Sequence, residues 1–536
     1  MRTLKVLSIS ALFASIILSC GSADIISTPI ENVDKNPLKV SELTKAEKEN
    51  WGHLDLIKDT IPGMSVDKAY AEIIKKRKGK KVIVAVIDSG IDIDHEDLDD
   101  VIWVNKDEKP GNGIDDDKNG YIDDIHGWNF LGDGYDEQLE FVRILASGDT
   151  SHPDYDRAQA EYNKEYPKWT ERKMRYEQIL TQVKSAHETL TNHFGKKDYT
   201  KEEVNAIETE DKGLQQSVQL AKYMYSNDLE SLEEAVKELE DGLVGINDRL
   251  NYNLNKEFNG RVNGDNPNDF TTKYYGNGNV KPVKKDESHG THVAGIIAAE
   301  RNNGLGANGV ANNVEIMCVR TVPNGDEYDK DVALSIRYAV DNGAKVINGS
   351  FGKSFSPHSA YVREAIAYAS DNDVVFVHAA GNDSKDVDTE PNFPDDNVDY
   401  VEVSNTYIRV GALAPKYGSN MLASFSNYGK QNVDIFAPGA SVYSTTPENE
   451  YMTKGGTSMA APAVAGIAAL IRSYYPNLSA AQVKQIIMDS GLTINTRVIV
   501  GGNSDDIRPF SEVVKSGKIA NAYNALIMAS KVSQAN

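Results

Sequence analysis

Short runs of apolar, largely β-branched residues recur along the chain and alternate with longer amphipathic stretches. The runs cover residues 81–87, 314–319, 344–347, 374–378 and 408–410. Such runs are typical of strands that are buried on both faces of a parallel sheet. The stretches 331–342 and 359–371 have helical spacing. Because strands and helices alternate, the pattern predicts an α/β fold with a mostly parallel sheet and helices on both faces.

One long region departs from this alternation. Residues 135–281 are rich in Glu, Lys, Gln and Tyr, and the segments 158–191 and 202–255 are compatible with helices. In the second segment an apolar stripe recurs mostly at intervals of three and four residues, at Leu229, Leu232, Ala235, Val236, Leu239 and Leu243. The stripe predicts a helical hairpin or small bundle, inserted into a domain of residues 51–134 and 282–530. The insertion is either a functional lid or a solvated arm without a role.

The composition excludes several classes of protein. The 536 residues are 40% hydrophobic and 26% charged, as in ordinary globular proteins, which argues against a multi-span membrane protein. Eighty acidic and 57 basic residues give a formal net charge of −23. A chain this negative repels nucleic acid, so nucleic-acid binding is not expected. The sequence does not indicate an oligomeric state.

The first residues have the pattern of an export signal. Arg2 and Lys5 precede a mostly apolar stretch over 6–18 that is too short to span a bilayer. Cys20 follows, and this arrangement resembles a bacterial lipoprotein signal, in which the cysteine becomes the lipidated first residue of the mature chain. The resemblance implies export to the bacterial cell envelope, with membrane anchoring through lipid on Cys20. A plain signal peptide over residues 1–19 is the alternative.

Two further expectations concern the tether and the second cysteine. Residues 20–50 are polar and lack periodicity, so they are predicted to form a tether or a loosely docked arm, with order beginning near Trp51. If Cys20 carries lipid, Cys318 has no disulfide partner, because the chain contains only two cysteines. The apolar surroundings of Cys318 predict an inert, buried thiol.

Three short segments place a reactive side chain beside glycines or other small residues. Asp88 follows the first apolar run, at the sheet edge where loops of α/β folds build active sites. His289 stands at the start of an apolar helical stretch. Ser458 follows Gly-Gly-Thr at the start of another helix, whose N-terminus favours developing negative charge. Taken alone, Asp88 is also a common turn residue, and His289 with His292 is also compatible with a metal site.

In the order Asp, His, Ser, the three segments resemble those of the subtilisin-like serine proteases, the subtilases. The resemblance covers about residues 51–134 and 283–529 and implies a subtilisin-like fold. It also implies the role of each residue. Ser458 is then the nucleophile, His289 the general base and later acid, and Asp88 the residue that orients the imidazole.

The resemblance implies the remaining parts of a peptidase site as well. Asn382 matches the asparagine that, with the backbone N–H of Ser458, donates to the oxyanion, and His292 is then structural. The implied function is an exported serine endopeptidase that cleaves protein or peptide substrates through an acyl-enzyme. The alternatives are a non-catalytic surface binding protein on the same fold and a serine esterase. Ser458 lacks the G-x-S-x-G context of α/β-hydrolases, which argues against the esterase.

Two acidic regions suggest binding sites for structural calcium. The alternative is that they are solvated acidic turns. In the first, oxygen ligands recur at nearly alternate positions, at Asp115, Asp117, Asn119 and Asp123. His126 stands where an EF-hand has its closing Glu, so a related loop closed by Asp123 or Asp124 is expected instead of an EF-hand proper. In the second, Asp97 and Asn303 match a calcium loop of the subtilases, in which backbone carbonyls complete the shell.

Overall fold

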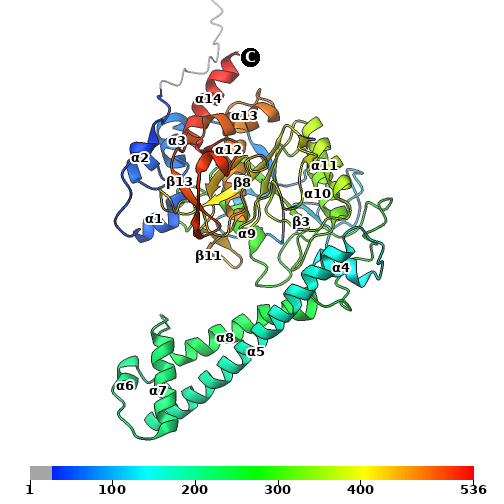
Figure 1. Cartoon of the computed structure of the whole chain (residues 1–536). Helices are drawn as coiled ribbons and strands as arrows, with labels where there is room; N and C mark the ends of the chain where they lie inside the picture. The colour runs from blue at the N-terminus through cyan, green and yellow to red at the C-terminus, as the bar shows by residue number, and fades with distance from the viewer. Residues whose placement is uncertain (1–26, 228, 536) are drawn as a thin grey trace, which may run out of the picture.

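The computed structural model describes residues 27–227 and 229–535, and a nine-stranded sheet forms its centre (Figure 1). The strand order is β12-β15-β9-β8-β5-β4-β1-β3-β2, and only the pair β12 and β15 is antiparallel. The strands are β1 (Val82–Asp88), β2 (Gly127–Asn129), β3 (Val314–Arg320), β4 (Val346–Gly349), β5 (Val375–Ala379), β8 (Tyr407–Leu413), β9 (Ile435–Pro438), β12 (Leu492–Thr493) and β15 (Lys518–Ile519). The predicted fold class is confirmed, since all five apolar runs coincide with strands of this sheet.

Helices cover both faces of the sheet. One face carries α9 (His289–Ala298), α12 (Thr457–Tyr474), α13 (Ala480–Ser490) and α14 (Ala522–Ala535), and the other carries α10 (Asp329–Asp341) and α11 (Ser359–Asp371). Val84 and Val86 of β1 belong to the first core, whereas Ala85 and Ile87 belong to the second. Successive strand residues point to opposite faces, so one strand serves both cores. This double burial explains why the strands read as uninterrupted apolar runs.

Smaller elements surround the sheet. Two-stranded ribbons pair β6 (Asn397–Val398) with β7 (Val401–Glu402), β10 (Val442–Thr446) with β11 (Glu450–Lys454), and β13 (Arg497–Val500) with β14 (Asn503–Pro509). Short helices precede β1, namely α1 (Lys45–Asn50), α2 (Leu56–Asp59) and α3 (Val66–Ala69). No helix in the described ranges combines the length and apolarity that a bilayer crossing requires.

The segment before Trp51 lies against the domain over its described part. The side chain of Val33 is buried in a core cluster, and the backbone N–H of Ile30 donates to Asn524 Oδ1 at 2.8 Å. Thr44 caps α1 through a capping box with Glu47. Regular structure therefore begins before Trp51. The export signal and Cys20 lie outside the described residues.

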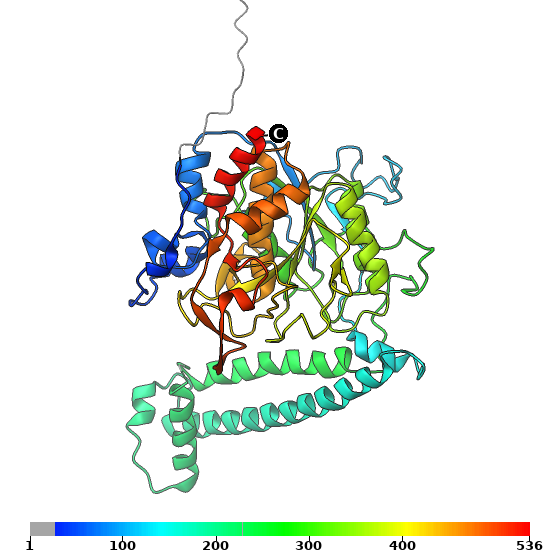
Figure 2. The ribbon, with the colours of Figure 1, turned by 45° about the horizontal axis from the view of Figure 1, so that its top comes forward.

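The insertion forms a long helical arm that projects from the domain (Figures 1 and 2). Its elements are α4 (Glu140–Ala146), α5 (Tyr155–Phe194), α6 (Lys201–Asn205), α7 (Lys212–Tyr225), α8 (Leu232–Asp248) and the π-helical turn η5 (Arg249–Asn253). Helix α8 packs along α5 in the opposite chain direction, and the apolar stripe faces this contact: Leu232 and Ala235 are buried with Val183 and Ala186 of α5. The arm therefore has a small core of its own.

The second helical segment of the insertion is divided into shorter helices, unlike the continuous stretch that the sequence suggests. Asp211 caps α7 by accepting from the backbone N–H of Leu214, and Ser231 caps α8 by accepting from that of Glu234. Each cap satisfies a donor that a new helix start leaves free. These residues start separate helices, so the chain can fold back against α5.

Candidate active site

The first two residues of the predicted triad meet at the carboxyl edge of the sheet. Asp88 is the last residue of β1, and His289 is the first residue of α9, 201 positions later. Nδ1 of His289 lies 2.7 Å from Oδ1 of Asp88. The Asp88 side chain is 1% exposed, whereas that of His289 is 38% exposed. A buried carboxylate thus holds one ring nitrogen and leaves Nε2 toward the open side of the site.

Ser458 comes from the second residue of α12, on a third segment. Its hydroxyl donates to the backbone carbonyl of Ser350 at 3.1 Å, and the Ser350 hydroxyl donates to the carbonyl of Ser458 at 2.9 Å. Among the described residues no hydrogen bond joins Ser458 to His289. In proteins without substrate, catalytic hydrogen bonds are often long or misaligned, so the arrangement is compatible with catalysis. Attack requires the Ser458 side chain to turn from Ser350 toward the imidazole.

Asn382 lies beside the backbone of Ser458 with its amide fixed in one orientation. Its Oδ1 accepts from the backbone N–H of Thr457 at 2.8 Å and from the Thr457 hydroxyl at 3.1 Å, which leaves Nδ2 to donate elsewhere. A Cβ on Gly456 would lie 3.5 Å from Asn382 Nδ2 and 3.6 Å from the Ser458 nitrogen. The bare glycine therefore borders both donors and leaves room beside them for an oxyanion.

His292 occupies the next turn of α9 and is fully buried. Its Nε2 lies 3.0 Å from the backbone carbonyl of Met452, and burial lowers the pKa of His292 to about 3. The ring is neutral at physiological pH, and one nitrogen is engaged by the carbonyl. This environment fits the structural role that the resemblance implies and gives no support to a metal site with His289.

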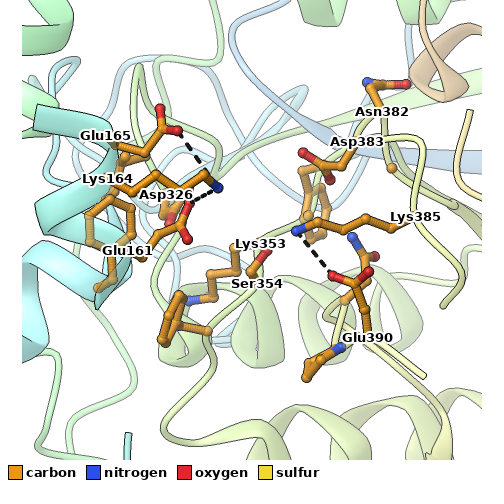
Figure 3. Close-up of a pocket in the computed structure, with 18 of the residues that line it drawn as sticks. Glu161, Lys164, Glu165, Asp326, Lys353, Ser354, Asn382, Asp383, Lys385 and Glu390 are labelled. Atoms are coloured by element: carbon orange, nitrogen blue, oxygen red, sulfur yellow. Dashed lines mark hydrogen bonds and ion pairs between the residues drawn. The ribbon is translucent and has the colours of Figure 1, made fainter. Parts of the chain in front are cut away.

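A cavity of about 850 Å³ opens beside Ser458 and Asn382 and is bounded on its far side by the insertion. Both sides of the cavity carry charges: the domain contributes Asp326, Lys353, Asp383, Lys385 and Glu390, and α5 contributes Arg157, Glu161, Lys164, Glu165 and Lys168. Figure 3 shows Glu161, Lys164 and Glu165 on one helix, across the cavity from Asn382. The inserted arm is therefore a wall of the candidate substrate cleft, a placement that is compatible with the functional lid that the sequence left open beside a solvated arm.

The root of the arm is fixed to the domain. Nη1 of Arg157 donates to the Ser354 carbonyl at 3.0 Å, and its guanidinium lies 3.7 Å from the centre of the Phe355 ring. A buried apolar cluster adjoins these contacts and joins the insertion to Phe355 of the domain. Its members are Leu139, Phe141, Val142, Ile144, Leu145, Ala158, Leu254 and Phe355. Because close packing ties this part of α5 to the domain, the cleft wall is rigid at its base.

A buried ion pair stabilises the loops around the site, and sequence reasoning missed it. Arg320 ends β3 beside Asp88 and is paired with Glu287, which lies two residues before His289. The distances are 2.6 Å from Nε to Oε1 and 3.2 Å from Nη2 to Oε2. The same carboxylate accepts from the backbone N–H groups of Gly90 and Val283 at 2.7 and 2.8 Å. Arg320 and Glu287 lie 33 positions apart, and no local pattern in the sequence links them.

The acidic loop gathers only part of the predicted ligand set. Carboxylate oxygens of Asp115 and Asp117 lie within 4.8 Å of each other and of Glu108, which the spacing did not reveal. The Asp123 carboxylate is not part of this cluster and accepts from the backbone N–H groups of Asn112 and Gly113, although the Asp123 backbone N–H donates to Glu108 Oε2 at 3.2 Å. Asn119 stays nearby: its Nδ2 donates to Asp117 Oδ2 at 3.0 Å, and its Oδ1 accepts from the N–H of Tyr121.

The second predicted calcium pair is brought together. Nδ2 of Asn303 donates to Oδ1 of Asp97 at 2.8 Å, and the backbone N–H of Ala307 donates to Oδ2 at 3.1 Å. Asp97 is fully buried. A buried carboxylate and an amide side by side fit the oxygen donors that calcium prefers, provided that the Asn303 amide turns its oxygen inward.

The remaining cysteine matches its sequence-based expectation. Cys318 is buried in β3, and burial raises the pKa of its thiol. The thiolate, which is the reactive form, is therefore disfavoured. This side chain contributes to core packing and not to the chemistry of the cleft.

Proteins of known function resemble this chain in sequence. The chain is 40% identical over 240 residues to "Thermophilic serine proteinase" of Bacillus sp. (strain AK1), covering 45% of this chain and 52% of that one. It is 36% identical to subtilisin DY of Bacillus licheniformis (40% and 73% covered) and 34% identical to thermitase of Thermoactinomyces vulgaris (46% and 78% covered). The chain thus spans about half the length of the first relative and about three quarters of the other two. A sequence model of the subtilase family matches residues 79–501, which is well over half of the chain. By this match and by these relatives, the chain belongs to the subtilase family of serine proteases.

Proposed function

We propose that this protein is a serine endopeptidase that hydrolyses peptide bonds through an acyl-enzyme. The observation that carries the proposal is that three distant segments meet at two adjoining hollows, which share Phe351 and Gly352 as lining residues. Asp88 is bonded to His289 at 2.7 Å, and Ser458 stands beside Asn382 with two donors bordering the same space. Nucleophile, base, orienting carboxylate and oxyanion donors are the parts that acyl transfer requires.

The proposed reaction uses each group in turn. After rotation of its side chain, Ser458 Oγ attacks the peptide carbonyl carbon while Nε2 of His289 takes the hydroxyl proton. The carbonyl oxygen becomes an oxyanion and receives hydrogen bonds from Asn382 Nδ2 and the Ser458 N–H. His289 then protonates the leaving amine, and Asp88 stabilises the imidazolium between the two transfers. Water, activated by the same imidazole, hydrolyses the acyl-enzyme.

Covalent labelling tests this assignment. A fluorophosphonate reacts with an activated serine, so the native chain should gain one label, which peptide mass mapping should locate on Ser458. A label on another residue contradicts the assignment of the nucleophile. A folded chain that takes up no label favours a non-catalytic binding protein on the same fold.

We propose further that the protein is exported and held in the bacterial cell envelope by lipid on Cys20. The support is the signal-like pattern of residues 1–19 with the cysteine directly behind it. Replacing Cys20 by serine should move the protein from the membrane fraction to the soluble envelope fraction, because the lipid supplies the apolar anchor. Immunoblots of the two fractions measure this. A variant that stays in the membrane fraction argues against lipid on Cys20.

We also propose that calcium stabilises the fold through the acidic loop and the Asp97 pair. Glu108, Asp115 and Asp117 would supply hard oxygen ligands in the loop, and Asp97 with Asn303 would supply them in the second site. In each site the bound ion would neutralise the negative charge of the carboxylates that ligate it. Excess chelator should therefore lower the melting temperature by several degrees, since an ion that binds only the folded state at 100 times its Kd contributes about 2.7 kcal/mol.

A matched pair of variants locates this effect in the loop. Asp115→Asn should reduce the chelator-dependent change in melting temperature. Asp116→Asn should leave it intact, because Asp116 faces Lys109 at 3.1 Å instead of the cluster. Scanning calorimetry with and without chelator measures both variants. Equal melting temperatures of the native protein in both conditions, without bound metal by elemental analysis, would reject both sites.

The arm is proposed to restrict access of folded proteins to the cleft. Its root lines the cavity beside Ser458, and Figure 2 shows α5 and α8 continuing alongside the domain. The distal part is separable, since its buried cluster runs from Val183 to Ala235 and shares no residue with the domain cores. A Cβ on Gly242 would lie 2.9 Å from the Tyr176 ring, so the two helices can be joined there.

Replacing residues 177–241 by a short Gly/Ser linker is therefore expected to raise cleavage of a folded protein several-fold relative to a short peptide. A peptide passes the arm, whereas a folded domain has to approach the cleft as a rigid body. Parallel kcat/KM measurements on the two substrates check this, with thermal melting as the control for folding. A lower ratio would instead indicate recruitment of substrates by the arm, and an unchanged ratio would leave it without a role in access.

A further inference from the structure

A second hollow, of about 340 Å³, lies around the candidate general base. It is lined by Asp88, His289 and the segment around Phe351, and one of its walls is Lys454. Lys454 is the last residue of β11 and is half-buried. Its Nζ donates to the hydroxyl of Ser288 at 2.9 Å, directly before His289 in the chain. The ammonium thus stands beside the first turn of α9.

Lys454 differs from the other lysines of this region in having no counter-ion. Lys284 pairs with Asp136 at 2.8 Å, and Lys285 pairs with Glu448 at the surface. Within the described residues no carboxylate lies within 4.0 Å of the Lys454 ammonium. Burial lowers the pKa of Lys454, and no neighbouring acid opposes this change. A partly desolvated cation without a counter-ion is costly, which favours a binding partner that supplies negative charge.

Among the described residues, none of the acids that line the hollow forms an ion pair with this ammonium. Asp88 is bonded to His289, and Glu287 is paired with Arg320. Glu327 is buried with its pKa raised to about 7, chiefly by burial, so its charge is partly suppressed. Asp286 lies at the exposed rim and forms no ion pair in the described chain. The other titratable groups that face His289 are His292, which is neutral, and Tyr135.

We propose that Lys454 is a specificity-determining residue that binds an acidic substrate side chain on the leaving-group side of the scissile bond. The inference rests on the proposed peptidase function. His289 has to reach the leaving amine in order to protonate it, so the residue that follows the scissile bond passes next to the imidazole. Lys454 is the cation beside that passage, and an aspartate or glutamate there would complete an ion pair that the free protein lacks.

Two peptides that differ only in the residue after the scissile bond, glutamate or glutamine, test the proposal. For the native enzyme the glutamate peptide should have the higher kcat/KM. In Lys454→Met the ratio of the two values should fall about fivefold, as expected for an ion pair with partial solvent access. Lys454→Arg, which keeps the positive charge, should retain the preference.

Lys285→Met is the matched control, because it removes a cation from the same region whose side chain is 72% exposed and already paired. It should leave the ratio of the two kcat/KM values unchanged. An unchanged ratio in a folded Lys454→Met variant would overturn the inference, and so would an equal change in Lys285→Met. If the native enzyme cleaves no peptide at all, the proposed peptidase function is wrong. If it cleaves both peptides at equal rates, only the inference about Lys454 is wrong.

Discussion

Replacing Ser458 by alanine is expected to lower kcat for peptide hydrolysis by about 10⁴-fold or more while leaving the fold intact. The change removes the only atom that can form the acyl-enzyme in the proposed mechanism. The structural cost is small, because the half-buried hydroxyl makes one hydrogen bond, to the Ser350 carbonyl. Activity remaining above the uncatalysed rate would come from the oxyanion donors and from substrate binding.

Initial rates on a peptide amide and fluorophosphonate labelling measure this result together. Ser473→Ala is a suitable control, since it removes a hydroxyl from the same helix at a buried position that lines neither cavity. It should keep both turnover and label. Undiminished labelling of a folded Ser458→Ala variant would show that another residue is the nucleophile.

Replacing Glu287 by glutamine is expected to lower the free energy of unfolding substantially. The substitution keeps the size of the side chain but removes the charge that compensates Arg320, whose side chain is fully buried. An amide group would also turn N–H donors toward the guanidinium or toward the N–H groups of Gly90 and Val283. Breaking a buried ion pair from one side costs about 3–5 kcal/mol, so the melting temperature should fall by about 6 °C or more.

Glu315→Gln is the matched control for this prediction. Glu315 pairs with Lys81 at 3.1 Å, but the lysine side chain is 62% exposed, and such surface pairs contribute at most about 1 kcal/mol. Denaturant unfolding of both variants gives the comparison. Because Gly90 follows Asp88 by two residues, Glu287→Gln should also lower kcat/KM. Equal losses of unfolding free energy in the two variants would mean that the buried pair stabilises the fold no more than the surface pair does.

The sequence by itself predicted the elements whose signals are local. The five apolar runs identified central strands because strands buried on both faces need apolar residues at every position. The bounds of α11 agree with the predicted stretch 359–371 at both ends. Asp88, His289 and Ser458 stood out because each lies next to glycines at the end of a strand or the start of a helix. Their roles were implied by resemblance, since no local pattern shows which distant residue a side chain will meet.

The tertiary structure decided what depends on contacts between distant residues. It brings Asp88 and His289 together across 201 positions and replaces Asp123 with Glu108 in the acidic cluster. It also places α5 against the cleft beside Ser458, although the insertion showed only an amphipathic pattern. The physical reason is the same in each case. Periodicity reports which face of a segment is buried, whereas a site forms from whichever side chains the packed segments bring within a few ångströms, and that proximity is a property of the whole fold.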